Sequence, residues 1–186
     1  MTSAPLPQPR FRATLPVLTV LAALLLGAAM PAMADAVDDA QKLVRRNQYL
    51  QAQEKIDVAL AEDPNNAQAL FLKGVVLSET GRTEDAIAVF TRLTETYPEM
   101  PEPYNNLAVI YARQKSYEQA RLALEMAIRA NPTYGTAYEN LGDIYAKLAN
   151  QSYARAAQLE PNSKSARAKL TLSNELLGSS AKPASR

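Results

Sequence analysis

The chain has 186 residues, with 20 Lys and Arg side chains against 19 Asp and Glu, and it contains neither Cys nor His. This length allows one domain with a substantial core, and the balanced charge gives no indication of a nucleic-acid ligand. The lack of Cys and His excludes disulfides, thiolate nucleophiles, histidine general bases and nearly all zinc or haem sites. The sequence also has no Asp-rich calcium loop and no Gly-rich phosphate loop, so we expect no metal and no other cofactor.

Residues 1–34 have the composition of an export signal. Arg10 and Arg12 precede an uncharged apolar run from residue 15 to residue 30, and Ala32-Met33-Ala34 has the pattern of a cleavage site. We therefore expect cleavage after Ala34 and a periplasmic or secreted protein, exported by the general secretory route. The alternative is an uncleaved membrane anchor, although a run that ends at Pro31 is short for a full span.

A 34-residue periodicity follows the signal. Six sets of similar residues recur at this step: Pro64, Pro98 and Pro132; Ala52, Ala86 and Ala120; Ala40, Gly74, Ala108 and Gly142; Leu43, Leu77, Tyr111 and Tyr145; Ile56, Phe90 and Leu124; and Ala59, Leu93 and Ala127. Within one unit, Leu70, Gly74 and Leu77 lie on one face of a first helix, and the spacing from Ala86 to Leu93 predicts a second helix. Gly81 indicates a turn between the two helices, and Asn47 holds the same position in the first unit.

A 34-residue helix–turn–helix with these small, aromatic, alanine and proline positions resembles the tetratricopeptide repeat. The resemblance implies an all-α fold, a right-handed α-solenoid of helix–turn–helix pairs. Three full units are predicted at about 35–66, 67–100 and 101–134, with a shortened unit at 135–161, so that the array covers residues 35–160. Because this fold has many unrelated binding roles, the resemblance predicts function only weakly.

The fourth unit lacks five residues at the position of its turn. Its apolar stripe continues from Tyr138 through Tyr145 to Leu159, and no Gly or Pro lies between residues 143 and 160. We expect the last pair to be fused into one long helix over about 136–160; the alternative is a tight turn at residues 149–151. Ser163 is a suitable N-cap for a C-terminal capping helix at about 164–177, in a segment spanning 162–177, and residues 178–186 are predicted to be a disordered tail.

In the family that this sequence resembles, the first helices of successive units line a concave groove. The positions that face it here, and that form the candidate partner-binding site, are Phe71, Val75, Asn105, Asn106, Val109, Arg113, Glu139, Asn140 and Asp143. Phe71 and Val75 suit either a peptide contact or packing between helices. Asn106 and Asn140 are equivalent positions that either hold a peptide backbone or only improve solubility. The Lys and Asn set with which some relatives bind a terminal carboxylate is not matched. We interpret four tyrosines as packing residues: Tyr104, Tyr111, Tyr138 and Tyr145.

The leading hypothesis is a non-enzymatic scaffold of the bacterial cell envelope that binds a peptide or partner protein in the groove. One alternative is a self-associating structural module, a homodimer through the helix at 148–160. Another is an accessory domain of a larger envelope assembly or enzyme. An independent hydrolase is the least favoured, because Glu139 and Asp143, four residues apart, suit a solvated pair better than a catalytic one. We expect no nucleic-acid partner, and contact with a membrane only through an uncleaved signal segment.

Overall fold

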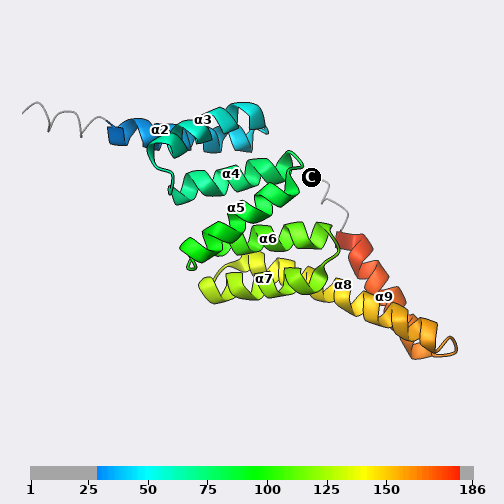
Figure 1. Ribbon diagram of the computed structural model, residues 1–186. Coiled ribbons are helices and arrows are strands. Elements are labelled where there is room, and N and C mark those ends of the chain that lie inside the picture. Colours follow the sequence, from blue (N-terminus) through cyan, green and yellow to red (C-terminus); the bar gives the residue numbers. More distant parts are fainter. Residues whose placement is uncertain (1–28, 181–186) are drawn as a thin grey trace, which may run out of the picture.

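The computed structural model describes residues 29–180, with side chains from residue 36 to residue 178. Eight α-helices and no strands lie in this part of the chain (Figure 1): α2 (Ala29–Arg45), α3 (Tyr49–Glu62), α4 (Ala67–Glu79), α5 (Thr83–Thr96), α6 (Pro101–Arg113), α7 (Tyr117–Ala130), α8 (Gly135–Leu159) and α9 (Lys164–Ser180). The predicted all-α solenoid of helix pairs is therefore confirmed. The signal prediction falls mostly outside the described residues, and Ala34 lies within α2.

Each of the first three pairs encloses its own apolar cluster. Ala40 with Ile56, Leu70 with Phe90, and Ala108 with Leu124 belong to three successive clusters of buried residues. Apart from Leu70, these residues belong to the sets that recur at the 34-residue step, so the periodic positions are contact positions between paired helices. Half-buried residues such as Leu60 and Tyr111 each pack against two clusters and join the pairs into one stack.

The turn within each of the first three pairs has the same geometry. Asn47, Gly81 and Lys115 have φ angles of 57°, 80° and 60°, in the left-handed region that closes a helix at its C-terminus. The amide of the next residue bonds five residues back, as from Arg82 N to Leu77 O at 2.9 Å. Asn47 and Gly81 were predicted for this position, whereas Lys115 is a residue for which the conformation is unfavourable.

The predicted fusion of the last pair is confirmed, since α8 runs without a break from Gly135 to Leu159. No helix of the fourth unit folds back at residues 149–151, so the alternative of a tight turn there is wrong. In Figure 1, α8 extends beyond α7 at the lower right, and α9 returns along it. The side chain of Asn150 donates to Ser173 Oγ at 2.9 Å and to Asn174 Oδ1 at 2.7 Å, which holds α9 against the distal half of α8.

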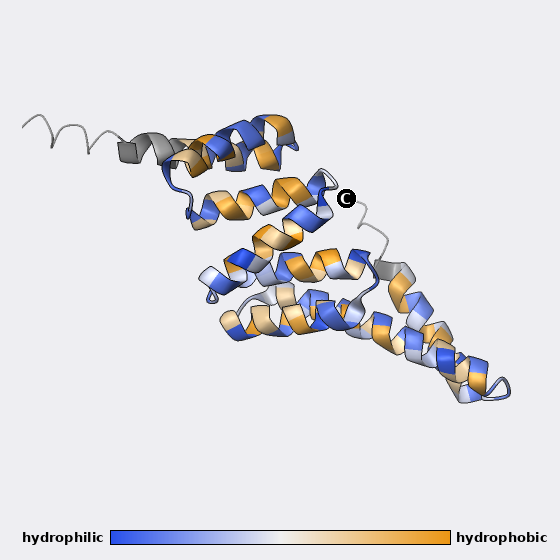
Figure 2. Cartoon of the chain, viewed as in Figure 1, coloured by the Kyte–Doolittle hydropathy of each residue, from blue (hydrophilic) through white to orange (hydrophobic). Residues whose placement is uncertain are grey.

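The C-terminal helix begins as the sequence predicts. Ser163 Oγ accepts a hydrogen bond from Ala166 N at 3.3 Å, which is the expected N-cap contact. The helix ends at Ser180, beyond the predicted residue 177, so the first three residues of the predicted tail 178–186 are helical. The rest of that tail, 181–186, lies outside the described residues. Polar and apolar residues alternate along the α8–α9 pair, unlike the more continuous apolar stretches of α4 (Figure 2).

The fusion changes what covers the first half of α8. Leu70 and Tyr104, which are equivalent positions in units two and three, are 6 % and 9 % exposed, but Tyr138 is 50 % exposed. Tyr145 is also 50 % exposed, whereas Leu77, its equivalent, is 3 % exposed. The prediction that these tyrosines are packing residues is therefore correct for Tyr104 and only half correct for Tyr138 and Tyr145. The physical reason is that no second helix folds back over them.

Candidate partner-binding groove

The first helices α6 and α8 enclose a cavity of about 280 Å³ on the groove side of the last repeat. Its wall combines small and branched apolar side chains, among them Ala108, Val109 and Ile144, with Asn140 and three charged residues. Successive first helices lie side by side because each is packed against the second helix of the preceding unit. The structure thereby brings together four of the predicted site residues: Val109, Arg113, Asn140 and Asp143.

The charged residues of this cavity differ in what they contact. Arg113 Nη2 lies 3.5 Å from Glu79 Oε1, an ion pair between equivalent positions of neighbouring units. Lys147 Nζ lies over the Tyr117 ring, 6.0 Å from its centroid. Asp143 is exposed and has no ion pair within the described residues. Because all three are near the solvent, the cavity offers both signs of charge around an apolar floor, which suits a polypeptide more than a single small ion.

The asparagines of the groove are engaged with the chain itself. Asn140 Nδ2 donates to Asn105 Oδ1 at 2.7 Å, which links α8 to α6 and gives the buried Asn105 side chain a hydrogen-bond partner. Asn106 Nδ2 donates to the backbone oxygen of Glu102 at 2.9 Å, one turn earlier on the same helix. The cross-helix amide contact therefore joins Asn140 to Asn105 and not to Asn106. The two donating amide groups, those of Asn106 and Asn140, each retain a second N–H for a ligand.

Phe71 and Val75 are half-buried and pack against the cluster of the second repeat. The Phe71 ring centroid lies 5.9 Å from that of Phe90, in a tilted arrangement. The other side of Phe71 lines a shallow cavity of about 430 Å³ together with Gln41, Gln68, Met100 and Glu102. The packing interpretation of Phe71 is supported by its contact with Phe90, and the peptide-contact interpretation by its position in the wall of this cavity. Phe71 does not line the cavity between α6 and α8. Glu139 is exposed and lines neither cavity.

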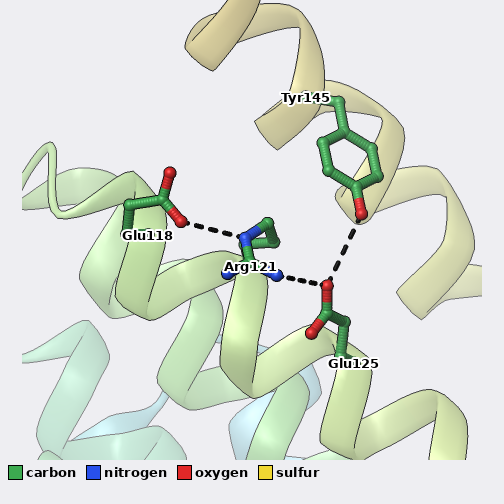
Figure 3. A network of polar contacts seen from close by, with 4 residues as sticks. All are labelled: Glu118, Arg121, Glu125 and Tyr145. Atoms are coloured by element: carbon green, nitrogen blue, oxygen red, sulfur yellow. Dashed lines mark hydrogen bonds and ion pairs between the residues drawn. The ribbon is translucent and has the colours of Figure 1, made fainter.

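A polar network that the sequence analysis did not single out connects α7 to α8 (Figure 3). Arg121 lies between Glu118 and Glu125, at 2.9 Å and 2.5 Å, and the Tyr145 hydroxyl donates to Glu125 Oε1 at 3.5 Å. Hydrogen bonds from the Arg121 guanidinium, first to Glu118 and then to Glu125, raise the pKa of Arg121. The spacing of Glu118, Arg121 and Glu125 on one helix face was a signal for the ion pairs, but not for the contact with Tyr145.

The described residues give no sign of metal chemistry or of a membrane span. They contain no group of three or more carboxylate side chains placed to hold a metal ion. Between residues 29 and 180, every helix is too short or too polar to cross a bilayer.

Burial, followed by the charge of Glu102, raises the pKa of Tyr134, while a hydrogen bond with Thr136 acts in the opposite direction.

Comparison with solved structures shows the same solenoid in several proteins. The crystal structure of MamA protein superposes with a TM-score of 0.55 at 23 % identity, covering 79 % of this chain and 83 % of MamA. PilF of Pseudomonas aeruginosa gives a TM-score of 0.59 at 18 % identity, with 82 % and 78 % of the two chains covered. The Sgt2 TPR domain from Aspergillus fumigatus gives 0.61 at 19 % identity, over 66 % of this chain and 82 % of that domain. These likenesses concern the fold alone.

Sequence comparison points to the same family. The Arabidopsis thaliana tetratricopeptide repeat domain-containing protein PYG7, chloroplastic, is 30 % identical over 136 residues, which are 68 % of this chain and 45 % of that protein. This chain therefore matches less than half of the length of that relative. The family model described as tetratricopeptide repeat matches residues 37–101, 76–135 and 105–160, which cover all four predicted units. The chain thus belongs to the tetratricopeptide repeat family.

Proposed function

We propose that this protein is a non-enzymatic scaffold of the bacterial cell envelope that binds a segment of a partner protein in its concave groove. Tetratricopeptide repeat proteins generally act as scaffolds that bind protein or peptide partners. The observation that carries the proposal is the cavity of about 280 Å³ between α6 and α8, with Val109 in its apolar wall and Arg113, Asp143 and Lys147 around it. The envelope location rests on the signal pattern of residues 1–34.

The chemistry of the cavity defines the segment that it suits. Apolar side chains of a ligand fit between Val109 and Ile144, and the free N–H of the Asn140 amide can bind a backbone carbonyl. Lys147 and Asp143 favour a ligand that carries charges of both signs. We therefore propose an extended or helical peptide of mixed charge as the ligand, rather than one that is recognised by its terminal carboxylate.

Site-specific photocrosslinking in cells tests the proposal. A photoreactive residue at Val109 is expected to capture a discrete partner, and Arg113→Glu in the same chain is expected to reduce the adduct. Ala88, exposed on α5, is the control position. Val109 is preferable to Phe71 because Phe71 supports Phe90 and its replacement would disturb the core. Equal adducts from Val109 and Ala88 would refute groove binding.

The envelope location has a separate test. Cell fractionation with intact-mass measurement is expected to place the protein outside the cytoplasm, with its N-terminus at Asp35 if cleavage follows Ala34. A full-length mass in the membrane fraction would instead support an anchor, and a cytoplasmic protein would contradict the proposed location.

Self-association through the helix at 148–160 is the second candidate, and one observation favours it. Leu159 is 65 % exposed at the end of α8. Against it, α9 covers part of the surface that this dimer would use, since Tyr153 is half-buried with Lys169 Nζ 5.7 Å from its ring centroid. Light scattering of the purified protein and of a Leu159→Ser variant tests self-association, because only a dimer that forms through this end of α8 dissociates on the substitution.

A further inference from the structure

The terminal face of the array, formed by Tyr138, Gly142 and Tyr145 on α8, continues an interface that the molecule forms three times. Leu70, Gly74 and Leu77 hold the same positions on α4. Leu70 and Leu77 share one buried cluster with residues of α5, and Gly74 lies against the Phe90 ring. Tyr104 and Ala108 on α6 are buried with residues of α7 in the same way. On α8 the two tyrosines are each 50 % exposed, and a Cβ added at Gly142 would meet no atom within 4 Å.

The complete repeats show what such a face accepts. At Gly74 an added Cβ would lie 2.6 Å from Phe90 Cε1, so the aromatic ring occupies the space that a side chain would fill. Where the equivalent residue is Ala40 or Ala108, the second helix presents Ile56 or Leu124 instead. Glycine is thus found opposite the planar ring, and alanine opposite a branched aliphatic side chain. Gly142 is the other glycine at this position, which indicates an aromatic residue as its complement.

The described side chains of α9, which end at residue 178, leave the terminal face exposed. They contact α8 further along, where Ser173 and Asn174 bind Asn150. Leu172, which is 64 % exposed, lines a shallow apolar cavity with Ala146 and Ala149 of α8. These two alanines follow Gly142 by four and seven residues, so they extend the same stripe of α8. The terminal face and this cavity therefore form one apolar strip along α8.

The edge of the strip beside α7 is acidic. The Tyr145 hydroxyl contacts Glu125, which shares Arg121 with Glu118 (Figure 3). Two carboxylates and one guanidinium leave a net negative charge on this network. A partner that lies along α8 at this edge gains from a Lys or Arg directed at Glu125.

We propose that the terminal face binds an amphipathic helix of another protein, which takes the position of the missing second helix of the fourth unit. The ligand helix carries an aromatic residue over Gly142, a small residue four positions before it, and a basic residue towards Glu125. A second copy of this chain is not the proposed occupant. Phe71 and Phe90, the only phenylalanines of the described residues, are packed together in the core, and the half-exposed aromatic residues of α8, Tyr138 and Tyr145, belong to the terminal face itself. Light scattering distinguishes a second copy from a partner helix. This inference does not depend on the groove between α6 and α8.

A direct binding measurement with a defined probe tests the inference. The probe is a fluorescent synthetic peptide with the sequence of residues 82–98, the segment around α5, in which Glu84 is replaced by Lys, because the start of α5 lies against Leu77, the equivalent of Tyr145. It is titrated with the purified protein and followed by anisotropy. Gly142→Leu is expected to weaken binding by about tenfold or more, whereas Ala88→Leu, a comparable increase in size on an exposed part of α5, changes it by less than about twofold. Replacing Phe90 of the peptide with Ala is expected to weaken binding as much as Gly142→Leu does.

Circular dichroism and light scattering provide the controls for the peptide titration. Circular dichroism should show that neither Gly142→Leu nor Ala88→Leu lowers the helix content or the melting temperature, so that a loss of binding reports the face and not the fold. Light scattering reports the second copy: a dimer that dissociates on Gly142→Leu would overturn the assignment to a partner helix. The absence of peptide binding, or equal binding by Gly142→Leu, would overturn the inference as well, and neither result bears on the adduct at Val109.

Discussion

Gly74 and Gly142 hold equivalent positions in the repeat, but the structure predicts opposite effects of the same substitution. Alanine is favoured over glycine in a helix by about 1 kcal/mol. At Gly142 nothing opposes this gain, because the added methyl group would meet no atom within 4 Å. Gly142→Ala is therefore expected to raise the free energy of unfolding by about 0.5–1 kcal/mol.

At Gly74 the added methyl group would lie 2.6 Å from Phe90 Cε1, about 0.8 Å inside the 3.4 Å limit of ordinary contact. Phe90 is fully buried and packed against Phe71, so its ring cannot move without displacing other core residues. Overpacking of this kind costs about 1–3 kcal/mol, which exceeds the gain in helix propensity. Gly74→Ala is therefore expected to lower the free energy of unfolding by about 1 kcal/mol, and the two variants should differ by about 2 kcal/mol.

Urea unfolding followed by circular dichroism measures both variants, and a double-mutant cycle identifies the cause. Phe90→Leu alone should destabilise by about 1 kcal/mol through loss of packing. In the Gly74→Ala background the same change should cost less, because it recreates the Ala108 and Leu124 combination of the third unit. A Phe90→Leu cost that is equal in both backgrounds would refute the steric explanation, and equal effects of the two glycine variants would refute the difference in packing.

Three other substitutions test local features. Lys115→Gly should stabilise the protein by about 1 kcal/mol in urea unfolding, because Lys115 has a φ of 60° that glycine adopts without strain; a loss of stability would show that the Lys side chain contributes more than the backbone. Ser163→Ala should destabilise by about 1 kcal/mol through loss of the bond to Ala166 N, and Ser163→Asp, which retains a cap, should not. The raised pKa of Tyr134 means that its neutral form stabilises the fold fully below about pH 10 and that this contribution is lost as pH rises through the folded-state pKa. Tyr134→Phe should therefore show a smaller loss of stability between about pH 9 and pH 11 than the parent protein.

The sequence by itself determined those features that depend on neighbouring residues or on the 34-residue step. The turns at Asn47 and Gly81, the N-cap at Ser163 and the unbroken helix α8 were all predictable, because each follows from backbone preference or from the loss of the turn residues. Lys115, which lies 34 residues after Gly81, was not singled out, because lysine as a residue type gives no signal for a left-handed conformation.

Only the tertiary structure decided which side chains of the repeat remain available. Periodicity assigned the same role to Gly74 and Gly142, yet one meets the Phe90 ring and the other faces open space. Periodicity also paired Asn106 with Asn140, whereas the hydrogen bond joins Asn140 to Asn105. The physical reason is that a repeat defines the face of a helix on which a residue lies, but burial and hydrogen bonding depend on the neighbouring helix. At the end of the array that neighbour is missing, and its absence exposes the surface that we propose for a partner helix.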